Sequence, residues 1–170
     1  MARLVLSDAS PLIGLARVDG LPWLATLFGS VGVPDEVRRE VLSRQQWPDE
    51  QAIGAAFETG ILRRLDAPSE VRKEISESLA LANLDEGEAA CIRYALASAG
   101  SVLLLMDEKA GRSVAQDHGL PVAGTAALIG MAHQRGLIPS AKAVFARLHA
   151  SDFRIAAGVI AEILRRVGED

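Results

Sequence analysis

The sequence predicts a single α/β domain built on a parallel sheet. Short apolar segments alternate with longer segments of helical periodicity, which is the pattern of strand–helix–strand units. The clearest strand, residues 102–106, is apolar throughout, as expected for a strand covered on both faces. At 170 residues the chain is long enough for one domain with a substantial core. We therefore expect residues 1–170 to form one domain.

The first half of the chain contains three strand candidates separated by helices. Residues 3–7 form the first, and Ser10 is the expected N-cap of the following helix, with Pro11 at its first position. The other elements expected here are helices over 12–18, 23–28, 35–44 and 52–57 and strands over 30–33 and 61–65. Two arginines in the last of these strands place it at a sheet edge.

The second half is mainly helical. Its expected elements are helices over 69–81, 88–99, 109–118, 125–135, 139–149 and 154–167 and strands over 102–106 and 120–123. The strands in this half are followed directly by helices, so the crossovers should be right-handed.

Composition narrows the classes of function. Net charge is −4 and the pI is about 5.4, which disfavours a protein that coats nucleic acid through a broad basic surface. No apolar run is long enough to span a bilayer, and no secretory leader is recognisable at the N-terminus. A single cysteine, Cys91, cannot form an internal disulfide. These features predict a cytoplasmic protein without a membrane association.

Acidic residues stand where predicted strands or loops pass into helices. Asp8 follows the first strand and Asp107 follows the most apolar one, while Glu40 and Glu88 lie on predicted helices. Parallel sheets bind ligands at the carboxyl ends of their strands, so acids distant in sequence can meet there. Gathered carboxylates repel one another unless they share a proton or bind a cation. The pattern therefore predicts a site for a hard metal ion.

Two of these acids also have ordinary structural explanations. Glu40 can pair with Arg44 one helical turn away. Asp85 and Glu88 have the spacing of a capping box, which accounts for both without any chemistry. Asp85 also remains an alternative to Glu88 as the third acid of the site.

Other catalytic patterns are missing from the sequence. There is no glycine-rich phosphate loop, and the three histidines lack the spacing of a zinc site. Arginines near Glu40 (Arg38, Arg39 and Arg44) and the pair Lys109 and Arg112 after Asp107 are candidates for phosphate contacts. For any one of them, a local ion pair on a solvated helix face is the simpler interpretation.

Five segments in order resemble the PIN-domain family, and more closely a PIN-like subgroup of unassigned function related to VapC-type toxin ribonucleases. They are Leu-Ser-Asp8-Ala-Ser-Pro-Leu-Ile, Val-Pro-Asp-Glu-Val-Arg-Arg-Glu40-Val, Leu-Asp-Glu-Gly-Glu88-Ala, Leu-Leu-Met-Asp107-Glu-Lys-Ala-Gly-Arg112 and Val-Ala-Gly-Thr125. The resemblance covers nearly the whole chain.

The resemblance implies a three-layer α/β/α sandwich with a central parallel sheet of four or five short strands. It also implies an endoribonuclease that hydrolyses RNA phosphodiester bonds with Mg²⁺ or Mn²⁺. The implied catalytic and metal-binding residues are Asp8, Glu40, Glu88 and Asp107. Ser10, Lys109 and Arg112 are assigned to the substrate, with Arg112 holding Asp107 in place as the alternative.

Two departures from the family pattern bear on activity. The third acid is Glu88, where many of these toxins have aspartate, and Thr125 is followed by Ala126 and not by another acid. These departures favour the rival hypothesis, a catalytically weak PIN-like module that binds RNA or protein. A phosphate enzyme acting on small molecules is a third hypothesis, disfavoured by the missing phosphate loop.

Partners are implied in the same way. A toxin-like protein has an RNA substrate and an antitoxin protein that occludes its acidic cleft. The alanine- and leucine-rich helices from residue 139 onward offer a face for a homodimer, although the same pattern suits ordinary core packing.

Overall fold

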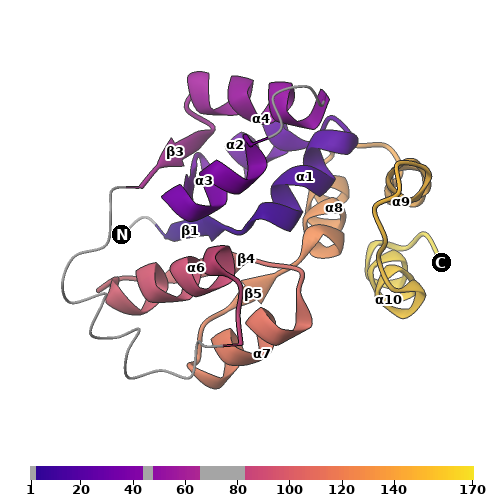
Figure 1. The fold of residues 1–170 in the computed structure, drawn as a ribbon. Coiled ribbons are helices and arrows are strands. Elements are labelled where there is room, and N and C mark those ends of the chain that lie inside the picture. Colours follow the sequence, from indigo (N-terminus) through magenta and orange to yellow (C-terminus); the bar gives the residue numbers. More distant parts are fainter. Residues whose placement is uncertain (1–2, 44–47, 66–82) are drawn as a thin grey trace.

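The computed structural model describes residues 3–43, 48–65 and 83–170. In this part of the chain five parallel strands form one sheet in the order β3-β2-β1-β4-β5 (Figure 1). The strands are β1 (Leu4–Ser7), β2 (Val31–Val33), β3 (Leu62–Arg64), β4 (Val102–Leu105) and β5 (Val122–Ala123). The α/β class with a parallel sheet is thereby confirmed.

The pairing of β1 with β4 determines where the residues that follow these two strands lie. Their register runs from Leu4 opposite Val102 to Ser7 opposite Leu105. One residue further on, the Asp8 N–H donates to the Leu105 carbonyl oxygen over 2.9 Å. The two strands therefore end at the same level, and the residues that follow them lie at the same edge of the sheet.

Helices cover both faces of this sheet, which makes the three layers of the expected sandwich. The helices are α1 (Ala9–Arg17), α2 (Leu21–Phe28), α3 (Asp35–Val41), α4 (Pro48–Glu58), α6 (Glu86–Ala97), α7 (Lys109–Asp117), α8 (Thr125–Gln134), α9 (Ala141–Ala150) and α10 (Ala157–Val167). In Figure 1, α1, α2 and α4 lie on one side of the sheet and α6 and α7 on the other. The helix expected over 69–81 falls outside the described residues.

The start of α1 differs from the expectation. The N-cap is Asp8, with extended backbone (φ −77°, ψ 175°), and Ser10 lies inside the first turn of the helix. The chain passes from β1 into α1 without a loop, so the helix begins as soon as the strand ends. The Ser10 hydroxyl is consequently free of capping and donates to Oδ2 of Asp107 over 2.9 Å.

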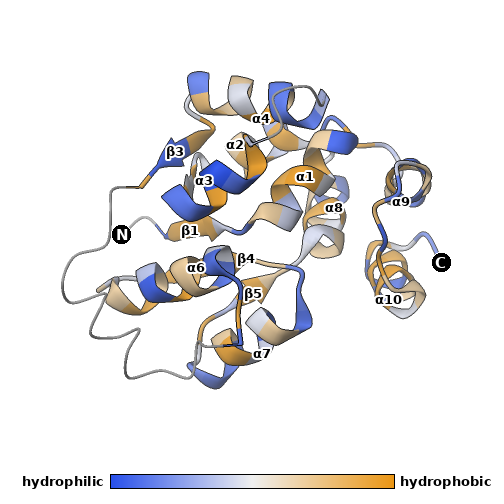
Figure 2. Ribbon diagram, viewed as in Figure 1, coloured by the Kyte–Doolittle hydropathy of each residue, from blue (hydrophilic) through white to orange (hydrophobic). Residues whose placement is uncertain are grey.

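The apolar side chains form two clusters of buried residues. The larger lies on both faces of the sheet, and Leu6 and Leu104, on neighbouring strands, are completely buried in it. The smaller joins α8, α9 and α10 through residues such as Ile129, Phe145 and Ile163. Figure 2 shows the apolar central strands and the hydrophilic strand β3. Strand β3 lies at the sheet edge, as its arginines predicted.

Within the described ranges, no helix combines the length and the apolarity that crossing a membrane requires.

Leu104→Ala should lower the free energy of unfolding by about 2–5 kcal/mol, because the central strand has no room to close the resulting cavity. The loss should be measured by urea unfolding. Val159→Ala, at an exposed position on α10, is the control and should change stability by less than about 0.5 kcal/mol. Equal effects of the two changes would contradict the assignment of Leu104 to the core.

Candidate functional site

Three carboxyl groups converge at the carboxyl edge of the sheet. Asp8 comes from the end of β1, and Asp85 and Glu88 come from the start of α6. One oxygen of each lies within 4.8 Å of one oxygen of the others. Such a group of oxygens is within reach of a single hard cation. We call Asp8, Asp85 and Glu88 the acidic triad.

Two oxygens of the acidic triad are buried without a hydrogen-bond partner. Asp8 is only 3% exposed and Glu88 only 4%. Oδ1 of Asp8 and Oε1 of Glu88 both lack a partner among the described residues. A buried carboxylate oxygen without a donor is strongly disfavoured. The pair therefore fits a site that a cation or a proton completes.

The predicted capping box is present and leaves these oxygens free. Oδ1 of Asp85 accepts from the Glu88 N–H over 2.8 Å, and Oε2 of Glu88 accepts from the Asp85 N–H over 3.1 Å. The box uses the other oxygen of Glu88, so it orients Oε1 toward the interior. Asp85 and Glu88 can therefore cap α6 and still offer oxygens to a cation.

Glycines make the space that these carboxylates occupy. A Cβ on Gly87 would come within 2.9 Å of Oδ1 of Asp8, and one on Gly111 within 2.6 Å of Oε1 of Glu88. A Cβ on Gly124 would come within 2.8 Å of Oδ1 of Asp107. All three glycines stand where a side chain would displace an acid of the site.

Burial dominates the titration of Asp8. Desolvation raises the pKa of Asp8 from 3.8 to about 7, and the charges of Asp85, Glu88 and Glu40 add to the effect. The N–H of Ala9 acts in the opposite direction. At neutral pH the carboxyl group therefore titrates between a protonated form and a charged form that attracts cations.

The same causes act on two neighbouring glutamates. Burial raises the pKa of Glu88, and the charges of Asp85 and Glu108 add to the effect, while the backbone N–H groups of Asp85 and Gly111 act in the opposite direction. Burial also raises the pKa of Glu40, together with the charge of Asp85. Glu40 itself is exposed on α3, and it lines a cavity of about 380 Å³ with Asp85. It therefore lies at the mouth of the site, outside the acidic triad.

Asp107 lies at the same sheet edge, also outside the acidic triad. Its Oδ2 accepts from the Ser10 hydroxyl over 2.9 Å and from the Thr125 hydroxyl over 2.7 Å. Its Oδ1 accepts from the Thr125 N–H over 2.7 Å. These hydrogen bonds fix the carboxylate at the ends of β1, β4 and β5.

The three residues assigned to substrate occupy different environments. Ser10 is bound to Asp107, as described above. Arg112 donates to the Met106 carbonyl oxygen over 3.1 Å, and this hydrogen bond braces the end of β4. Lys109 is exposed in the first turn of α7.

Local sequence patterns do not identify Gly87, Gly111, Gly124 or the role of Thr125 at the site. Thr125 was visible only as a motif residue, because its role depends on β5 lying beside β4. The glycines carry no functional group, so only the packed structure reveals what they make room for.

Comparison with known proteins decides the family. A family model described as a PIN domain matches residues 4–169. The chain belongs to the PIN-domain family. This confirms the resemblance at the level of the family and gives the chain a nuclease-type fold, while the relation to VapC-type toxins stays a prediction. A search of curated proteins finds no significant match.

In this PIN domain, Asp8→Asn should stabilise the metal-free protein at alkaline pH. A raised pKa means that folded Asp8 holds its proton more tightly than unfolded Asp8, so this stability is complete below about pH 4 and lost as the pH rises through about 7. The loss amounts to about 4 kcal/mol at most, and asparagine does not ionise.

Urea unfolding in chelator at about pH 5 and about pH 8 measures this effect. The gain from Asp8→Asn should be larger at the higher pH. Asp117→Asn, at an exposed carboxyl on α7, controls for the loss of one charge. A gain that does not grow with pH would show that Asp8 is not held in an unfavourable charged state.

Gly87→Ala should weaken Mn²⁺ binding by about 10-fold or more, because the new methyl group displaces Oδ1 of Asp8 without altering any charge. Calorimetric titration measures the affinity. Gly54→Ala on α4 is the matched control, since a Cβ there meets nothing within 4 Å. Unchanged Mn²⁺ affinity in Gly87→Ala would show that metal binding does not depend on the position of Asp8.

Proposed function

We propose that this PIN domain is a divalent-metal-dependent endoribonuclease that hydrolyses RNA phosphodiester bonds. The observation that carries the proposal is the pair of buried, unpartnered oxygens on Asp8 and Glu88, with Asp85 within reach of the same cation. An acidic group of this kind on a nuclease-type fold supports metal-assisted hydrolysis.

The acidic triad would hold the metal ion. Carboxylate oxygens are the ligands that Mg²⁺ and Mn²⁺ prefer, and Mg²⁺ retains several waters when few protein ligands are present. The bound ion would supply an acidified water and neutralise charge on the phosphate. The capping box would keep Glu88 and Asp85 in one orientation.

The remaining acids would act around that centre. Glu40, at the mouth of the cavity, is placed to orient a water or accept its proton, and burial raises its pKa, which makes it a stronger base than an exposed glutamate. Asp107, fixed by Ser10 and Thr125, would approach the metal or its waters with its remaining lone pairs. Lys109, exposed at the start of α7, would contact phosphate.

A specific observation favours a second candidate, a PIN-like module that binds RNA or protein with little turnover. Asp85 and Glu88 already serve the start of α6 as a complete capping box. The carboxylates of Asp85 and Glu88 therefore stabilise the start of α6 even in a protein that never binds metal. A divalent-ion titration followed by an RNA cleavage assay separates the two candidates.

The biological setting is proposed by the family resemblance alone. The chain would be the toxin of a toxin–antitoxin pair in the cytoplasm, with an antitoxin that inserts a basic side chain between the acids. Association of two copies through the helices from residue 139 onward belongs to the same proposal.

Asp8→Asn and Asp107→Asn should each lower Mn²⁺-dependent cleavage of RNA by about 100-fold while leaving the fold intact. The first removes a charge from the acidic triad, and the second removes one beside it. Cleavage of a labelled RNA is measured with and without metal, and circular dichroism reports the fold. Asp117→Asn is the control and should cleave like the wild type. Full activity of Asp8→Asn, or metal-independent cleavage, would refute the proposal.

A further inference from the structure

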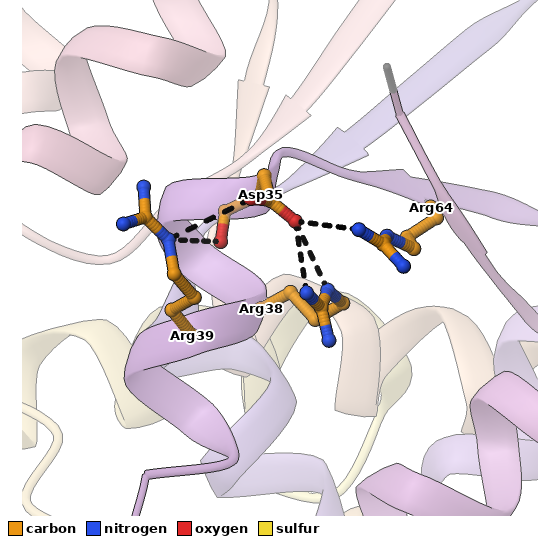
Figure 3. A network of polar contacts seen from close by, with 4 residues as sticks. All are labelled: Asp35, Arg38, Arg39 and Arg64. Atoms are coloured by element: carbon orange, nitrogen blue, oxygen red, sulfur yellow. Dashed lines mark hydrogen bonds and ion pairs between the residues drawn. The ribbon is translucent and has the colours of Figure 1, made fainter. Parts of the chain in front are cut away.

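Three arginines surround a single carboxylate beside the acidic site (Figure 3). Asp35, in the first turn of α3, accepts at Oδ1 from Nε and Nη2 of Arg38 over 3.1 and 3.0 Å. Nη2 of Arg64, from β3, approaches the same oxygen at 3.5 Å. Nε of Arg39 lies 3.6 Å from Oδ2.

The charges of this cluster do not balance. One carboxylate faces three guanidinium groups, which leaves a formal charge of +2. The hydrogen bond from Arg38 lowers the pKa of Asp35, so its carboxylate stays ionised and keeps the arginines in place. We call Arg38, Arg39 and Arg64 the arginine patch.

The outer arginines of the patch remain available to a ligand. The side chains of Arg39 and Arg64 are 64% and 66% exposed. Each guanidinium has five N–H donors, and only a small part of them faces Asp35. A planar fork of donors held in one orientation is suited to phosphate oxygens.

The arginine patch adjoins the site already described. Arg39 and Glu40 are consecutive on α3, and both line the cavity of about 380 Å³. The other charged residues of its lining are acidic: Glu36, Asp85 and Glu86. A strand that crosses the patch at Arg39 therefore enters the cavity beside the acids. An acidic centre repels phosphates, so a polyanionic substrate needs a cationic surface close to it.

We propose that the arginine patch binds the sugar–phosphate backbone of the RNA strand and guides it into the acidic cavity. This inference rests on the proposed function, because it supplies the contact that holds the substrate of that site. The patch contains fixed guanidinium forks and no apolar anchor, so it suits a phosphate backbone better than a folded protein partner. Contacts of this kind position a strand without reading its sequence.

The double variant Arg39→Gln/Arg64→Gln tests the proposal in the chain of residues 1–170. Binding of a fluorescent single-stranded oligouridylate is measured by anisotropy in chelator, where metal-dependent cleavage does not occur. Affinity should fall about tenfold, and the slope of log affinity against log salt should decrease by about 1.4, or about 0.7 for each lost phosphate contact.

The chain offers a matched control on α10. Arg165 and Arg166 flank one carboxylate, Glu162, and are as exposed as Arg39 and Arg64. Arg165→Gln/Arg166→Gln removes the same charge and should leave affinity and salt slope near the wild-type values. Equal losses in the two double variants would overturn the proposal, since they would reflect net charge alone.

Further outcomes separate this inference from the proposed function. Loss of RNA binding in the patch variant, with no Mn²⁺-dependent cleavage by the wild type, would support the patch and refute the ribonuclease. Unchanged RNA binding with active wild-type cleavage would refute the patch alone. If the patch variant loses binding to polyglutamate but keeps binding to RNA, the patch serves an acidic protein and the proposal falls.

Discussion

The cost of burying carboxylates that lack hydrogen-bond partners is the constraint on which the site depends. Asp8 lies almost completely buried at the end of the central strand β1, within reach of Asp85 and Glu88. Burial raises its pKa, so the charged form is unfavourable in that position. A protein that keeps such an arrangement has a site in which either a proton or a cation lowers the free energy. In this PIN domain, the stabilisation that a bound cation would give is consistent with the nuclease-type fold.

The fold holds the two buried carboxylates in place despite this cost. Asp8 is fixed by the register of β1 against β4, and its own N–H is bound to Leu105. Glu88 is fixed by the capping box at the start of α6. Neither carboxylate can move far from the other without breaking a strand pair or a helix cap. The site is therefore built into regular elements and not into loops.

Much of this organisation follows from the sequence. The apolar run over 102–106 and the acid after it locate β4 and Asp107, because buried parallel strands need no alternation. The arginines of the third strand placed it at the sheet edge. The spacing of Asp85 and Glu88 predicted a capping box, and that box is present.

Other parts of the site depend on packing between distant segments and could not be read from the chain. Serine is a favoured N-cap residue, which is why Ser10 was expected to cap α1. Because β1 passes directly into α1, Asp8 occupies the N-cap position. The convergence of Asp85 with Asp8 requires α6 to pack beside the end of β1, and spacing alone does not give that. Gly87 has no side chain to suggest a role, and its meaning lies in the carboxylate beside it.

Charges of opposite sign are separated around the site. Negative charge is concentrated at the carboxyl edge of the sheet, and positive charge lies next to it on α3 and β3. A chain of net charge −4 can thus present a cationic surface where a polyanion would arrive.

The proposed function depends on Asp8, Asp85 and Glu88 binding one divalent cation together. Anomalous diffraction from crystals soaked in Mn²⁺ tests it most directly. A single strong peak bounded by these three carboxylates is expected, and a peak elsewhere, or no peak, would show that they do not hold one ion together.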